Sequence, residues 1–62
     1  MEIYNKIKQA CDEQGISISE LEQKAGVANG IIGKWRVSTP NLSYLTRVAH
    51  ALGVHVRDLI ED

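Results

Sequence analysis

The sequence predicts an all-α domain built from five short helices. Three observations favour this class. The first two are that apolar residues recur at spacings of three and four along successive segments, and that glycine or helix-capping residues separate those segments. A third is that no segment alternates apolar and polar residues convincingly, as a half-buried strand would. With 62 residues the chain has room for one small core, so residues 1–62 are expected to form a single domain.

The first predicted helix runs from about Glu2 to Gln14, and Gly15 is its expected stop. Its inward face is expected to consist of Ile3, Ile7, Ala10 and Cys11. Because the chain has one cysteine, no intrachain disulfide can form, and Cys11 is expected to be a small core residue.

The second predicted helix, over residues 17–25, has the clearest start signal in the chain. Ser17 and Glu20 form an S-x-x-E capping box, in which each side chain accepts a hydrogen bond from the other residue's backbone amide. Ile16 and Leu21 occupy the two positions of a hydrophobic staple. A glycine ends the helix.

The third predicted helix lies within "GVANGIIGKWRVSTP", over about residues 29–36. Ala28, Ile32 and Trp35 are expected to point into the core. Gly30 and Gly33 are unexpected here, because each glycine inside a helix costs about 1 kcal/mol relative to alanine. One interpretation is that the missing side chains let this backbone approach a partner closely; the other is that the glycines mark a turn in a poorly formed helix.

Two further helices complete the prediction. The fourth follows Pro40, starts at the cap residue Asn41 and ends at Gly53. Its expected apolar stripe is Leu42, Leu45, Val48, Ala49 and Leu52. The last, over about residues 56–61 with His55 near its cap, is expected to bury Val56, Leu59 and Ile60.

The charges are distributed unevenly although the net charge is only −1. Residues 23–57 hold five basic side chains and no acidic one, while all eight acids lie outside that range. Such asymmetry can give a nearly neutral protein one positive face suited to nucleic acid. The alternative is charge scattered over a solvated surface.

Several classes of function are disfavoured. Cys11, His50 and His55 lack the spacing of a metal site, and no Gly-rich phosphate loop follows a strand, so we expect no metal, no cofactor and no enzymatic activity. The chain shows no apolar run of about 20 residues and no signal-peptide pattern, which favours the cytoplasm and no membrane partner.

Two helices joined by a short glycine-containing turn are typical of a helix-turn-helix. The stretches "GISISELEQKAGVANGIIGKW" and "PNLSYLTRVAHALGVHVRDLI" resemble the Cro/repressor-type (xenobiotic-response-element, XRE) helix-turn-helix family of bacteria and phages. The motifs "ANGIIGKW" and "VSTP" resemble its phage-repressor variants most. The resemblance implies a five-helix, lambda-repressor-like domain with the helix-turn-helix at about residues 17–36, its second helix entering the major groove of DNA.

The resemblance and the side-chain chemistry together predict the DNA contacts. Asn29 can bond adenine or a phosphate, Lys34 can reach guanine or a phosphate, and Ile31 can touch a thymine methyl, cap the core or meet a partner subunit. Backbone amides near Asn29 and Gly30 are expected to attract a phosphate. The full set of expected contacts is Ser17, Ile18, Ala28, Asn29, Gly30, Ile31, Gly33, Lys34, Ser38, Thr39 and Asn41.

The sequence departs from the family pattern at some of these positions. Ile18 stands where members commonly have a phosphate-clamping Gln, and Ala28 and Ile31 stand where they have Ser or Thr. Cys11 and Arg36 replace both partners of a common Arg–Glu pair. The expected DNA-facing surface is therefore less polar than usual.

The predicted function is sequence-specific transcriptional regulation, with repression by operator occlusion. A homodimer on double-stranded DNA with an inverted-repeat operator is expected, located in the cytoplasm on the nucleoid, with its dimer contact built from Val54, Val56 and Ile60. The alternative is a protein-interaction module that uses the same scaffold, with Ile18, Ile31 and Val37 as its apolar surface.

Overall fold

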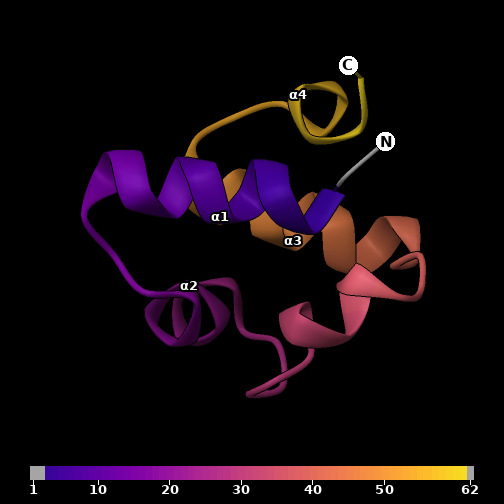
Figure 1. Cartoon of the computed structure of the whole chain (residues 1–62), viewed down its shortest axis with the longest axis horizontal. Helices are drawn as coiled ribbons and strands as arrows, with labels where there is room; N and C mark the ends of the chain where they lie inside the picture. Colours follow the sequence, from indigo (N-terminus) through magenta and orange to yellow (C-terminus); the bar gives the residue numbers. More distant parts are fainter. Residues whose placement is uncertain (1–2, 62) are drawn as a thin grey trace.

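The computed structural model describes residues 3–61, which form four α-helices and one short 3₁₀ helix (Figure 1). In chain order these elements are α1 (Ile3–Gln14), α2 (Ile18–Ala25), η1 (Ile32–Arg36), α3 (Leu42–Leu52) and α4 (Val56–Ile60). The all-α class is confirmed. The prediction of five α-helices is wrong at the third, where a turn leads into the 3₁₀ helix η1.

Helix α1 buries the predicted face. Ile3, Ile7 and Cys11 belong to the core, and Ala10 packs half-buried at its edge. Gly15 follows the helix as predicted, whereas the predicted start at Glu2 lies outside the described residues.

Helix α2 begins as its sequence predicts. The Ser17 hydroxyl accepts a hydrogen bond from the Glu20 amide at 3.0 Å, and the Glu20 carboxylate accepts one from the Ser17 amide at 2.9 Å. Leu21 is fully buried. At the other end Gly26 has φ of +72°, a left-handed conformation that favours glycine.

No α-helix forms across residues 28–36, because the segment lacks a capping side chain at its start and contains a left-handed residue. Ala28 has no side-chain oxygen to cap a helix. The prediction that Ala28 points into the core is wrong, because the residue is exposed. Gly30 has φ of +91°, which is incompatible with a right-handed helix. Ile32 and Trp35 are buried as predicted.

Helices α3 and α4 complete the core, but three of their predicted core residues are not fully buried. Leu45, Val48, Ala49, Leu52 and Leu59 are buried as predicted. Leu42, however, is the first residue of α3 and is 69% exposed, so the buried stripe of this helix begins one turn later, at Leu45. Ile60 is 37% exposed and Val56 is half-buried, so only Leu59 anchors α4 fully.

Helix α1 lies between α4 on one side and α2 and η1 on the other (Figure 1). Helix α2 packs mainly against α3, and η1 packs against α1. The side chain of Gln14 donates a hydrogen bond to the Leu52 carbonyl at 2.7 Å, and the Lys6 ammonium donates one to the Glu61 carbonyl. Within residues 3–61, no helix has the length and apolar character needed to cross a membrane.

Candidate nucleic-acid interface

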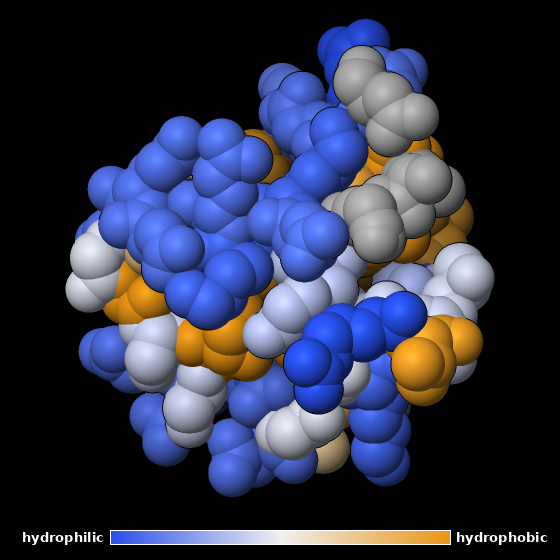
Figure 2. All heavy atoms as spheres, viewed as in Figure 1, coloured by the Kyte–Doolittle hydropathy of each residue, from blue (hydrophilic) through white to orange (hydrophobic). Residues whose placement is uncertain are grey.

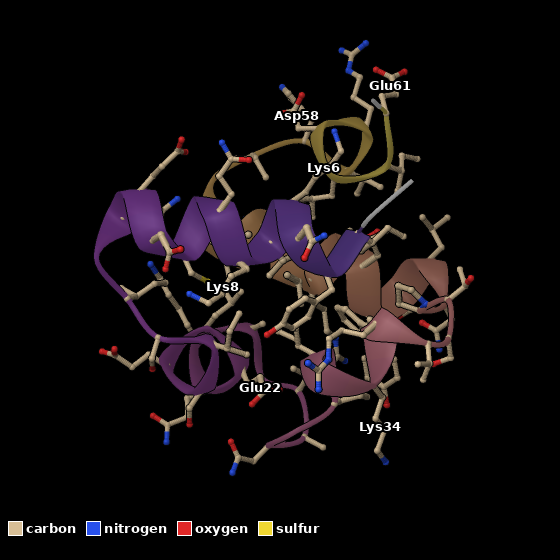
Figure 3. The ribbon with its side chains drawn as sticks, viewed as in Figure 1. Lys6, Lys8, Glu22, Lys34, Asp58 and Glu61 are labelled. Carbon is tan, nitrogen blue, oxygen red and sulfur yellow. The ribbon has the colours of Figure 1, made fainter. Side chains whose placement is uncertain are left out.

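The segment that joins α2 to η1 forms one edge of the molecule, on the opposite side of α1 from α4 (Figure 1). Ala28, Asn29, Gly30 and Lys34 are exposed along this edge, and Lys34 points away from the body of the protein (Figure 3). The predicted segment is therefore turned outward. Ile31 and Gly33 are half-buried.

Successive hydrogen bonds of the 3₁₀ type hold this edge. The amide of Ile31 donates to the Ala28 carbonyl, that of Lys34 to Ile31, and that of Val37 to Lys34, at 3.1–3.2 Å.

The carboxylate of Glu22 fixes this segment to α2. It is only 2% exposed, and its two oxygens accept hydrogen bonds from the Gly30 amide and the Ile32 amide, each at 2.9 Å. The sequence analysis did not identify Glu22, which it included only in the count of acids outside residues 23–57. Its neighbours on one face of α2, Ile18 and Ala25, are half-buried, and that pattern could have identified it.

This arrangement makes the Gly30 amide unavailable at the phosphate site expected near residues 29–30. The amides of Gly30 and Ile32 are already bonded to Glu22, and the Ile31 amide is bonded to Ala28. The anion that satisfies the start of η1 is thus the protein's own carboxylate.

The two glycines of the segment differ in their roles. Gly30 has φ of +91°, and a Cβ built there would meet no atom within 4 Å. Gly33 has an ordinary backbone and equally open surroundings. Gly30 is therefore required by the turn, as the second interpretation of the glycines proposed, and no close approach within the described chain explains either residue.

The side chain of Asn29 is oriented by α2. The Ser19 hydroxyl donates to the Asn29 carbonyl oxygen at 3.2 Å, which leaves the amide nitrogen free to donate outward. Asn29 and Lys34 therefore both present donors along the same edge. Donors suit phosphate oxygens and the acceptor atoms of guanine and adenine.

The loop after η1 carries the other expected contacts. Ser38 and Thr39 are exposed, but the Ser38 hydroxyl donates to the Lys34 carbonyl at 3.0 Å and so fastens the loop to η1. Asn41 is the cap of α3, and its side-chain oxygen accepts from the Tyr44 amide at 2.8 Å. At the α2 end, Ser17 is exposed and Ile18 is half-buried.

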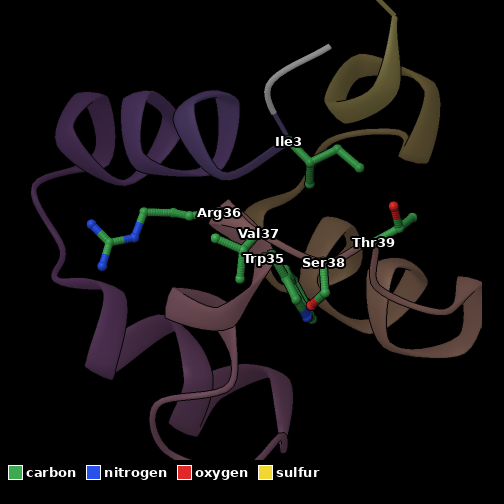
Figure 4. A pocket seen from close by; sticks show the side chains of 6 residues that line it. All are labelled: Ile3, Trp35, Arg36, Val37, Ser38 and Thr39. Atoms are coloured by element: carbon green, nitrogen blue, oxygen red, sulfur yellow. The ribbon is translucent and has the colours of Figure 1, made fainter.

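A shallow pocket opens beside this loop (Figure 4). Its lining is Ile3, Trp35, Arg36, Val37, Ser38 and Thr39. It includes neither Asn29 nor Lys34, so it is separate from the tip of the segment that presents donors.

Two arginines, one on η1 and one on α3, support the segment. The Arg36 guanidinium lies 5.4 Å from the centre of the Tyr4 ring, a cation–π contact that joins η1 to α1. Arg47 of α3 donates to the Gly26 carbonyl at 3.3 Å, at the turn that begins the segment.

The side chains expected in a dimer contact lie elsewhere. Val54 and Val56 are half-buried and Ile60 is exposed, on α4 and the loop before it, which lie on the opposite side of α1 from η1 (Figure 1). The face shown in Figure 2 is covered mostly by polar and charged side chains, with apolar atoms in separate patches.

The remaining polar chemistry is structural. Burial raises the pKa of the Cys11 thiol above its ordinary value, so this cysteine stays protonated in the core. The Lys8 ammonium lies 2.7 Å from the Asp12 carboxylate, and this hydrogen bond raises the pKa of Lys8. Among residues 3–61, no three His, Cys, Asp or Glu side chains gather where they could bind a metal ion.

Comparison with known proteins identifies the family of this chain. The profile of a helix-turn-helix family matches residues 7–59. The HTH-type transcriptional regulators SinR of Bacillus subtilis (strain 168) and of Bacillus licheniformis are each 35% identical across 97% of this chain. The chain spans 57% of the length of these relatives. The match over most of the chain, together with the position of α2 and η1, shows that it belongs to the helix-turn-helix family of the Cro/repressor (XRE) type.

Proposed function

We propose that this chain is a DNA-binding transcription regulator that presents η1 and the preceding segment to the major groove. The observation that carries the proposal is the edge formed by residues 28–30 and Lys34, which are exposed and where Asn29 and Lys34 offer hydrogen-bond donors. No acid lies between residues 23 and 57, so repulsion from that stretch does not oppose a phosphate backbone. The relatives named as transcriptional regulators support the same conclusion.

Each expected contact has a proposed role. Asn29 and Lys34 read base edges, and Ile31 contributes an apolar contact to the groove. Ser17, Ser38, Thr39 and Asn41 contact the backbone, which fixes the register without reading sequence. Ile18, Ala28, Gly30 and Gly33 line the interface without charge.

We further propose that two copies bind an inverted repeat and repress transcription by covering the promoter. Half-sites about 34–36 Å apart would place both copies on one face of the duplex. The partly exposed residues Val54, Val56 and Ile60 would form the contact between copies, because they lie away from η1 and leave its edge accessible.

The test is selection of bound duplexes from a random pool, followed by titration of the enriched sequence. Log K should fall linearly with log salt concentration, by about 0.9 per phosphate contact. Lys34→Ala should weaken specific binding by about 1–3 kcal/mol. Arg57→Ala is the matched control, because it removes one exposed cation from α4, on the other side of α1.

The outcomes separate the parts of the proposal. An enriched inverted repeat supports the dimer, a single half-site contradicts it, and no enrichment contradicts DNA reading. Equal losses for the two variants would mean that Lys34 acts only through net charge. If repression works by occlusion, the protein concentration that protects the promoter in a footprint should be the same as the concentration that stops transcription in vitro.

A second candidate function is docking of a partner protein on the same edge, which the 92% exposure of Val37 favours. The other two residues of that surface, Ile18 and Ile31, are half-buried and offer less area. Affinity for a protein partner through apolar contact should change little with salt. Salt dependence therefore distinguishes the two functions.

A further inference from the structure

We infer that Glu22 is the positioning residue of the DNA-reading segment, which its buried carboxylate holds in the reading geometry before DNA arrives. This inference rests on the proposed function. It assigns to an acid on α2 a part in binding a polyanion, although an acid near DNA would ordinarily oppose binding.

The geometry of the clamp carries the argument. Both carboxylate oxygens of Glu22 accept from backbone amides, those of Gly30 and Ile32, at 2.9 Å each. Hydrogen bonds to an ionised acceptor are about twice as strong as neutral ones, and two of them fix both position and orientation. Residues 30–32 are therefore tied to α2 through backbone atoms, whatever their side chains.

The clamp acts where the chain provides little other local support. The residue before η1, Ile31, makes no capping hydrogen bond with its side chain, and Gly30 occupies a left-handed conformation. Without the carboxylate, the amides of Gly30 and Ile32 would lose their partners, one of them at a buried site. The turn would then sample other conformations, and Asn29 and Lys34 on either side of it would move with it.

Electrostatics alone predicts the opposite effect of removing this acid. Each carboxylate on the DNA side repels phosphate, so neutralising one should strengthen binding to any duplex. If Glu22 positions the segment, neutralising it should weaken binding to the selected sequence. The sign of the change therefore separates the two roles.

The experiment compares Glu22→Gln with Glu20→Gln on the same helix. Both changes remove one charge, but Glu20 holds only the start of α2, and glutamine can serve in a capping box. Affinity is measured for the selected duplex and for a random duplex of equal length, and the free proteins are compared by NMR and amide exchange. Core amides such as that of Val48 report whether each variant is folded.

We expect Glu22→Gln to lose about tenfold or more in affinity for the selected duplex, since it gives up a charge-assisted bond. Affinity for the random duplex should stay equal or rise, and exchange of the Gly30 and Ile32 amides should accelerate. Glu20→Gln should leave both amides protected and binding equal or stronger. Selected-duplex affinity that is unchanged or raised in Glu22→Gln, with a folded core, overturns the inference.

Failure of the proposed function would be recognised separately. If the wild-type chain binds no duplex, regulation by DNA binding is wrong, whereas amide exchange still decides whether Glu22 holds the segment. If Glu22→Gln exchanges these two amides at wild-type rates, the clamp is wrong even where DNA binding is intact.

Discussion

Replacing Gly30 by alanine should destabilise the protein by backbone strain alone. A Cβ at this position would meet no atom within 4 Å, so no steric clash contributes. At φ of +91°, however, an L-residue is strained, and the cost of a left-handed conformation is about 1–2 kcal/mol. For a domain of this size that loss lowers the melting temperature by roughly 4–16 °C.

Gly33→Ala provides the matched control, three residues after Gly30. Gly33 has equally open space and no positive φ, so alanine should be neutral or should stabilise by up to about 1 kcal/mol. Thermal and urea unfolding followed by circular dichroism would measure both variants. D-Alanine at position 30, introduced by chemical synthesis, favours positive φ and should restore stability.

Equal stability of Gly30→Ala and wild type would refute this reasoning, because it would mean that the turn does not need a left-handed residue. A loss that D-alanine fails to restore would instead point to an unfavourable Cβ contact. Either result would require a different path of the backbone between α2 and η1.

Three further outcomes test the core and the edge. The buried Cys11 thiol should react with a thiol reagent only on unfolding. Because its pKa is raised in the folded state, the free energy of unfolding should decline as pH rises above about 8.5, where the unfolded thiol ionises. Urea titrations of Cys11→Ala should show a smaller decline. Leu45→Ala should cost about 2–5 kcal/mol, whereas Leu42→Ser should change stability by less than about 0.5 kcal/mol; similar losses would mean that Leu42 is covered. Ser19→Ala should leave stability nearly unchanged but alter the side-chain amide resonances of Asn29, and unaltered resonances would contradict their hydrogen bond.

The sequence predicts the helices well where local signals are complete. The Ser17–Glu20 capping box and the left-handed Gly26 define α2 from neighbouring residues alone. Asn41 does the same for the start of α3. Such features depend on contacts between residues three or four apart, which a pattern can reveal.

The third helix could not be predicted because its structure depends on a contact across eight and ten residues. Helical spacing of Ile32 and Trp35 suits an α-helix and a 3₁₀ helix equally, so periodicity could not choose between them. The choice follows from Gly30 and from the bonds that Glu22 makes to its amide and to that of Ile32. An acid that faces inward looks, in a sequence, like any other acid on a helix.

The exposed ends of helices limited the prediction of the core in a similar way. Leu42 follows the apolar spacing of α3, yet it is exposed at the first residue of that helix, and the buried stripe begins only at Leu45. Hydrophobic periodicity identifies a face and leaves open where along that face the packing stops.

Under the proposed function, the shortness of η1 and of the segment before it limits how many base pairs one copy can read. The proposed base contacts are Asn29, Ile31 and Lys34, and η1 itself extends only about 10 Å, so one copy would read roughly three base pairs. A given sequence of three base pairs recurs about every 64 base pairs in random DNA, which is far too often to identify a single promoter. Recognition of a single promoter would therefore need more base pairs than one copy contacts. A second copy can add them, or the protein can respond to the stiffness and groove width of the flanking duplex.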